Sequence, residues 1–236
     1  MKTIALKVVS LFLLTLPQVA APVALRADDP PVVTSPPPEA LAAALTAEAR
    51  RMIADYPDTR YSHKTYIDKQ QGICEVDCSG FIVVLLKHKS PKHLESIATT
   101  HKRALAEDFY AAFTSKQGTP VRGWKPIERL ADARPGDVLA WMKVDRVPGD
   151  NTGHVMLIAE NPTQESPDRF RVRIFDSTLH GHAHDQRTRT ERSGIGQGTL
   201  WIDVNGQGRP SGYRWESRTG MLHAAPIAIG RVVPLD

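Results

Sequence analysis

The spacing of the hydrophobic positions changes about half-way along the chain. Between residues 39 and 56 apolar side chains recur every three or four positions, which predicts an amphipathic helix that ends before Pro57. The same reasoning predicts helices over 79–87 and over 91–113, the latter with proline in its first turn. After Gly118 short apolar segments separated by glycine and proline predict strands over 138–142, 154–159, 169–174, 199–204 and 227–233. Helices followed by strands indicate one α+β domain.

The segment 169–174 alternates strictly between apolar and charged residues. Phe170, Val172 and Ile174 would face one side of a strand, and three arginines would face the other. If the strand continues, Asp176 falls on the apolar side. A core-facing position is unusual for a carboxylate, so Asp176 becomes a candidate functional residue.

The N-terminus has the pattern of a secretory signal peptide. Lys2 and Lys7 precede the apolar stretch 8–16, and small residues follow up to Ala27. The apolar stretch is too short for a membrane-spanning helix, although a retained anchor is the alternative. We therefore predict a signal peptide over 1–27, a proline-rich linker over 28–38 and a catalytic domain over 39–236. We expect export to a periplasmic or extracellular location, without stable membrane insertion after cleavage.

The net charge gives little reason to expect a nucleic-acid partner. It is +4 for the whole chain, from 30 basic and 26 acidic residues. Cleavage after Ala27 would remove three basic residues and no acidic one, which lowers the charge to about +1. A mature protein of that charge has no strong attraction for polyanions. The oligomeric state is left open.

Cys78 and His154 have the placement of a nucleophile and its base. A thiol attacks carbonyls efficiently only as a thiolate, which a neighbouring imidazole or a helix N-terminus favours. Cys78 lies where a helix is predicted to begin, with Asp77 as its cap, and His154 opens a strand after a loop. Asp176 could orient the imidazole, while a turn-capping role for Asp176 with His180 in its place is the alternative.

Two other features allow more than one interpretation. Cys74 and Cys78 could form a disulfide in an exported protein, which would block the nucleophile. His180, His182 and His184 would share one face of a strand and could bind a metal, but their surroundings indicate a loop, and we predict no metal. The segment after 185, with Trp201, Tyr213 and Trp215, either lines a substrate groove or completes the sheet.

Three ordered motifs resemble those of the NlpC-type cell-wall cysteine peptidases. Asp77-Cys78-Ser79-Gly80-Phe81 looks like the nucleophile motif, and Gly153-His154-Val155 is similar to the histidine motif. The turn 134–138 is similar to the one that precedes that histidine, and Tyr66 lies where the family has a tyrosine near the oxyanion site. The resemblance implies a papain-like α+β fold in which a helix carrying the nucleophile packs on an antiparallel sheet.

The resemblance also implies hydrolysis of amide bonds in peptidoglycan stem peptides, with no cofactor. Cys78 and His154 would be catalytic, and Tyr66, Asp77 and Ser79 would lie on the substrate and oxyanion side. The third catalytic residue of the family is often histidine, and here Asp176 takes that place by its position on the predicted strand. Two other functions are compatible with the same residues. One is a cell-wall-binding module without turnover, and the other is an acyltransferase or transglutaminase-like enzyme that passes the acyl group to an amine. The bond cleaved and the acceptor are not determined by the sequence.

Overall fold

The structure is a computed structural model, and it describes residues 37–114, 121–143, 145, 147, 151–187 and 193–235. The predicted signal peptide and nearly all of the predicted linker lie outside the described residues. Within the described part of the chain, no helix is long and apolar enough to cross a membrane.

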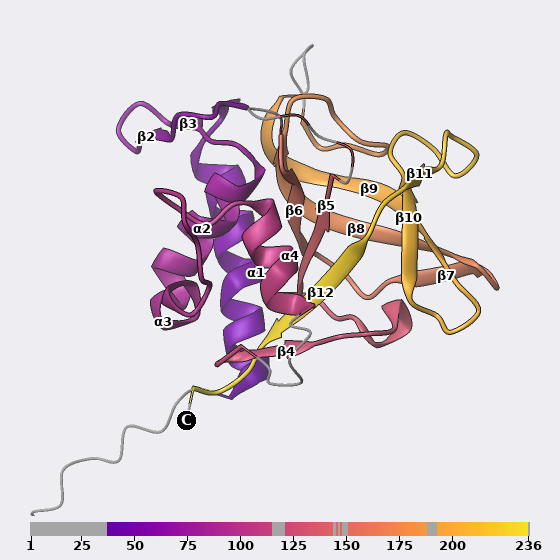
Figure 1. Cartoon of the computed structure of the whole chain (residues 1–236). Coiled ribbons are helices and arrows are strands. Elements are labelled where there is room, and N and C mark those ends of the chain that lie inside the picture. The colour runs from indigo at the N-terminus through magenta and orange to yellow at the C-terminus, as the bar shows by residue number, and fades with distance from the viewer. Residues whose placement is uncertain are drawn as a thin grey trace, which may run out of the picture. The chain divides into compact units, whose positions relative to one another are not determined.

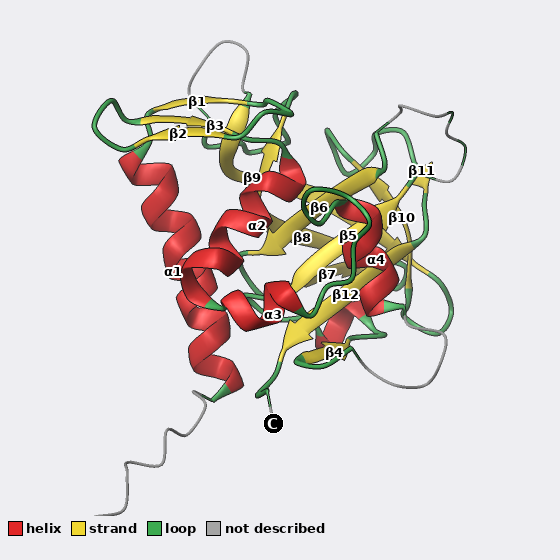
Figure 2. Cartoon of the chain, turned by 60° about the vertical axis from the view of Figure 1, so that its left-hand side comes forward, coloured by secondary structure: helices red, strands yellow, loops and turns green. Residues whose placement is uncertain are grey.

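Four α-helices form the first half of the described chain and gather on one side of a large sheet (Figures 1 and 2). Their bounds are α1 Pro38–Asp55, α2 Cys78–Lys89, α3 Pro91–Glu95 and α4 Ala106–Phe113. The helix predicted before Pro57 is confirmed as α1. The helix predicted over 79–87 is confirmed as α2, and all of residues 78–86 are buried.

The prediction of one helix over 91–113 is wrong, because α3 and α4 are separated by residues 96–105. The interruption has a local cause at the start of α4. The Asp108 carboxylate accepts hydrogen bonds from the Leu105 backbone N–H and the Thr99 hydroxyl, both at 2.8 Å. These bonds satisfy donors at a new helix start and hold the preceding loop against it.

A small sheet follows α1 in a stretch whose polar composition predicted no regular structure. It consists of β1 Asp58–Arg60, β2 Tyr66–Asp68 and β3 Ile73–Glu75 in the order β1-β3-β2, with β1 parallel to β3. Strands of three residues carry too little alternation to be recognised from the sequence.

The large sheet has nine strands in the order β11-β10-β9-β8-β6-β5-β12-β4, with β7 added beside β8, and its pairings are antiparallel. A short 3-10 helix, η1 Leu130–Asp132, precedes β5. The bounds are β4 Trp124–Pro126, β5 Val138–Met142, β6 Gly153–Ile158, β7 Thr163–Ser166, β8 Arg169–Thr178, β9 Gly194–Val204, β10 Pro210–Arg214, β11 His223–Ala224 and β12 Ile227–Val232. Each predicted strand is present, and β8 and β9 are longer than predicted. The chain is therefore α+β.

The sheet separates two hydrophobic cores. Alternate residues of the central strands, such as Val155 and Leu157 of β6, pack against the helices. Their neighbours, such as Met156 and Ile158, pack in a second core on the opposite face. This second core is enclosed because the sheet curves until β10 contacts β12. Side chains at the start of β6 and at the end of β8 can therefore lie near the N-terminus of α2.

Candidate active site

Cys78 is the first residue of α2, and the preceding Asp77 caps that helix. The Asp77 carboxylate accepts a hydrogen bond from the Gly80 backbone N–H at 2.7 Å, and it also accepts one from the Ser79 hydroxyl. Arg103 fixes both partners, since its guanidinium donates to Ser79 Oγ at 2.6 Å and to Asp77. The predicted residues Asp77 and Ser79 therefore shape the helix start that presents Cys78.

His154 is the second residue of β6, and the glycine before it lets this strand end approach β5 closely. Gly153 has a positive φ of 146°, and a Cβ there would lie 2.0 Å from the Trp141 carbonyl oxygen. The His154 ring packs against the Trp141 ring with 5.2 Å between centroids. The histidine is 8% exposed, so it borders the surface without standing free in solvent.

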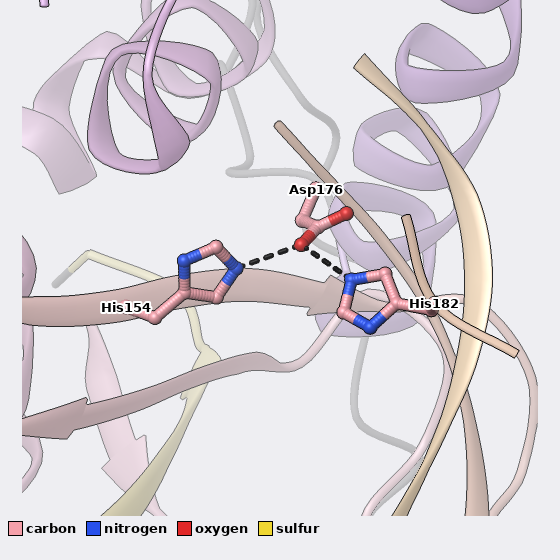
Figure 3. A group of neighbouring side chains, drawn as sticks. All are labelled: His154, Asp176 and His182. Atoms are coloured by element: carbon pink, nitrogen blue, oxygen red, sulfur yellow. Dashed lines mark hydrogen bonds and ion pairs between the residues drawn. The ribbon is translucent and has the colours of Figure 1, made fainter. Parts of the chain in front are cut away.

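Asp176 joins His154 where β6 and β8 separate. The ladder between these strands comprises Leu157–Phe175 and Ile158–Ile174. Just beyond it, Nε2 of His154 lies 2.7 Å from Oδ2 of Asp176 (Figure 3). β8 extends through Thr178, so the alternation places Asp176 on the side of Val172 and Ile174, and the carboxylate is fully buried.

The Cys78 thiol lies close enough to the His154 imidazole for the two groups to interact electrostatically. Burial alone lowers the pKa of His154, but the neighbouring Cys78 thiolate and the Asp176 carboxylate outweigh it and raise that pKa to about 10. Because Asp176 occupies Nε2, the contact with Cys78 falls to Nδ1. In Figure 3 this second nitrogen points away from Asp176. The three residues thus form a chain of contacts from sulfur to carboxylate.

The tyrosine beside Cys78 is Tyr61, and the structure does not bring Tyr66 there. Tyr66 is 49% exposed on β2, and its hydroxyl lies 3.4 Å from Asp68. Burial, together with Cys78 and Asp77, raises the pKa of Tyr61 well above its ordinary value. Tyr61 therefore keeps its proton and can donate a hydrogen bond near the sulfur. On this placement Tyr61, and not Tyr66, is the tyrosine near the sulfur.

Behind Asp176 lies a second layer of polar groups that sequence reasoning missed. Nε2 of His182 lies 2.9 Å from the same Oδ2 that His154 contacts, and Arg187 donates to Oδ1 at 2.6 Å. Arg187 also pairs with Asp185 at 2.6 Å. Burial raises the pKa of Asp176, but His182, Arg187 and His154 together hold it well below its ordinary value. The buried carboxylate is therefore ionised.

The sequence carries one signal for this layer, which is the alternation of glycines at the start of β9. A Cβ on Gly196 would lie 2.6–2.8 Å from the Arg187 side chain, and a Cβ on Gly198 would lie 2.7–2.9 Å from His182. Real side chains do not approach so closely, so the 182–187 loop lies across β9 only because these positions lack side chains.

His154, Asp176 and His182 also form a group whose donor atoms all lie within 4.8 Å of one another. A zinc ion would need both histidine nitrogens at about 2.0 Å. Here both nitrogens already hydrogen-bond to the carboxylate, and the Arg187 cation occupies its other oxygen. The donor set therefore fits an anion held by three hydrogen-bond donors better than a metal centre.

The remaining candidates lie apart from the His154–Asp176 pair or at the rim of the neighbouring cleft. His180 and His184 are exposed while His182 is buried, so the three alternating histidines do not converge. Cys74 is fully buried on β3, both cysteines are free, and burial raises the pKa of Cys74 to about 12. His180 lines the cleft, where its carbonyl accepts from the Trp215 indole at 3.3 Å.

A cleft of about 740 Å³ opens onto His154. Aromatic rings form one wall, because Trp141 stacks on Tyr213 with 4.0 Å between centroids and Tyr213 stacks on His223 at 5.1 Å. Tyr61, Leu179 and Trp215 also line it. Tyr213 and Trp215 therefore line the cleft, whereas Trp201 lies in β9 and is buried.

Comparisons with models of known protein families, with curated proteins and with solved structures found no match to this chain.

Proposed function

We propose that this protein is a cysteine hydrolase that cleaves amide bonds through a Cys78–His154–Asp176 triad, and that it acts on peptidoglycan stem peptides outside the cytoplasm. The observation that carries the proposal is the convergence of three residues from α2, β6 and β8. They are separated by 76 and 22 positions in the sequence, and they form a continuous series of contacts. Packing alone does not require a thiol, an imidazole and a carboxylate to lie in this order.

The geometry supports a two-step reaction. Because the pKa of His154 is raised to about 10, its Nδ1 already holds the thiol proton at neutral pH, and the Cys78 sulfur attacks the carbonyl carbon of the scissile amide as a thiolate. The oxyanion that forms lies near the start of α2, where the Cys78 and Ser79 backbone N–H groups precede the N–H groups bonded to Asp77, and near the Tyr61 hydroxyl. The His154 imidazolium then gives its proton to the leaving amine. Water, deprotonated by His154, releases the acid from the acyl-enzyme.

Asp176 supports this reaction without exchanging a proton. Its carboxylate holds the Nε2–H of His154 and stabilises the positive charge of the imidazolium. Because three donors hold its pKa well below its ordinary value, the buried carboxylate is available in that role at neutral pH.

The peptidoglycan substrate is supported by the sequence motifs and the predicted signal peptide. A cleft of about 740 Å³ adjoins His154, where a substrate would have to bind. Digestion of purified peptidoglycan tests the proposal, with soluble fragments identified by mass spectrometry. We expect wild type and Cys74→Ala to release the same stem-peptide fragments, and Cys78→Ala to release none.

Other results would replace the proposal. Equal release by wild type and Cys78→Ala, or no release by either, would rule out the peptidase. Binding to the wall without release would favour the non-catalytic module. New amide links to an added amine would favour an acyltransferase, and loss of activity with chelator would favour a metal-dependent hydrolase.

A further inference from the structure

His182 shares the carboxylate of Asp176 with His154, and the two imidazoles reach the same oxygen of Asp176 (Figure 3). Its side chain is completely buried. A carboxylate oxygen can only accept, so the His182 imidazole must carry a proton on Nε2 to satisfy this contact. The other nitrogen, Nδ1, has no hydrogen-bond partner among the described residues, which agrees with that assignment.

The lone pairs of Asp176 are thus divided between fixed donors. Arg187 holds Oδ1 at 2.6 Å, and the two imidazoles hold Oδ2 at 2.7 and 2.9 Å. With Oδ2 fixed between two imidazoles, the carboxylate cannot rotate without breaking a buried hydrogen bond. Its direction fixes in turn the direction of the His154 Nε2–H, and hence that of Nδ1 toward Cys78.

We propose that His182 is a positioning residue, which locks Asp176 by its Nε2–H donor so that His154 presents Nδ1 to Cys78. This inference rests on the proposed function and adds a fourth residue to the machinery. Its rival is a packing role, since the His182 ring lies against Trp215 with 3.9 Å between centroids. The two roles make opposite predictions for replacements that keep either the shape or the donor.

His182→Phe keeps a flat ring against Trp215 and removes the donor. His182→Gln keeps an amide N–H at about the reach of Nε2 and loses the ring. Gly198→Ala acts on the same residue from outside, because a Cβ at 198 would force the His182 ring to move. Gly206→Ala is its matched control, because a Cβ at 206 meets no atom within 4 Å.

Two measurements need no substrate. One is the rate at which iodoacetamide alkylates Cys78, located by mass spectrometry. The other is the far-downfield proton resonance of the His154 Nε2–H, present whether that ring is neutral or protonated. We expect His182→Phe and Gly198→Ala to slow alkylation by roughly tenfold, the usual effect of losing a hydrogen bond to a charged group, and to lose the resonance. His182→Gln and Gly206→Ala should keep the rate and the resonance of wild type.

The inference is overturned if His182→Phe melts as a folded protein and retains both the alkylation rate and the resonance of wild type. It is also overturned if the alkylation rate of His182→Gln falls as far as that of His182→Phe. If His182→Phe does not fold, Gly198→Ala and His182→Gln decide on the same criteria. His154→Ala separates this inference from the proposed function. If Cys78 is alkylated as fast in His154→Ala as in wild type, both the proposed function and the positioning role are refuted. If alkylation is slow in His154→Ala but unchanged in His182→Phe, only the positioning role is refuted.

Discussion

Cys74 and Cys78 are four positions apart, both are free and both are almost fully buried, with 0% and 4% exposure. Their neighbours differ. Cys74 lies on β3 between Thr59 and Ile67, and burial raises its pKa to about 12. Cys78 begins a helix and interacts electrostatically with His154 and Tyr61. Burial alone therefore does not distinguish Cys78, the candidate nucleophile, from Cys74. The two thiols differ in whether a charged partner lies close by.

The largest expected effect comes from removing each thiol in turn. Cys78→Ala should abolish hydrolysis, and Cys74→Ala should retain it while the free energy of unfolding falls by about 1 kcal/mol. Iodoacetamide should modify Cys78 in the folded protein and Cys74 only after denaturation. Fragment release, alkylation mapping and thermal melting provide the three measurements. Equal alkylation of the two thiols in the folded protein would remove the distinction on which the comparison depends.

Asp176→Asn should make Cys78 nearly as unreactive as Cys74, although the Cys78 thiol is still present. Whichever way the amide turns, its NH2 group meets a donor, either Arg187 or the two imidazoles. We expect hydrolysis to fall by roughly 10² to 10⁴, as for loss of a triad aspartate. The steady-state rate measures the effect, and a melting curve shows whether the variant is folded. A rate within twofold of wild type would remove Asp176 from the triad.

Tyr61→Phe should weaken stabilisation of the oxyanion while leaving the thiol free to react. The hydroxyl keeps its proton at neutral pH, so its loss removes one donor beside the sulfur. We expect kcat to fall by roughly a hundredfold with little change in alkylation of Cys78. Tyr66→Phe is the matched control and should leave kcat unchanged. The reverse result for the two tyrosines would return the role to Tyr66.

These placements show how much could be predicted from the sequence. The strict alternation of β8 was enough to turn Asp176 inward, and the capped start of α2 was enough to locate Cys78. Tyr61 could not be found, because strands of three residues leave no periodic signal and the choice of Tyr66 depended on its spacing from Cys78. His182 lies in a loop, where direction depends on contacts made far away in sequence, and the glycines of β9 become informative only once they are known to lie beneath that loop.

The titration of His154 should depend on one cysteine and not on the other. The Cys78 thiolate raises the pKa of His154, which reaches about 10, so Cys78→Ala should lower it and Cys74→Ala should leave it unchanged. In wild type, hydrolysis should persist through neutral pH. Above pH 10 it should fall by about tenfold per unit, because His154 then lacks the proton that the leaving amine needs. Histidine NMR titrations and a pH–rate profile measure both effects, and an identical His154 pKa in the two variants would show that the thiolate does not act on the ring.

The smallest expected effect concerns the helix start that makes Cys78 different from Cys74. Arg103 links Ser79 to the buried Asp77, so Arg103→Ala leaves the cap without its cationic partner. We expect the free energy of unfolding to fall by about 1–2 kcal/mol, the usual cost of a damaged helix cap. We also expect a few-fold loss of hydrolysis, because the first turn carries the nucleophile. Arg209→Ala removes an exposed pair with Glu128 and should cost less than about 1 kcal/mol. If chemical denaturation gives equal losses for the two variants, Arg103 contributes no more than a surface ion pair, and the position of Cys78 must be held by the packing of α2 alone.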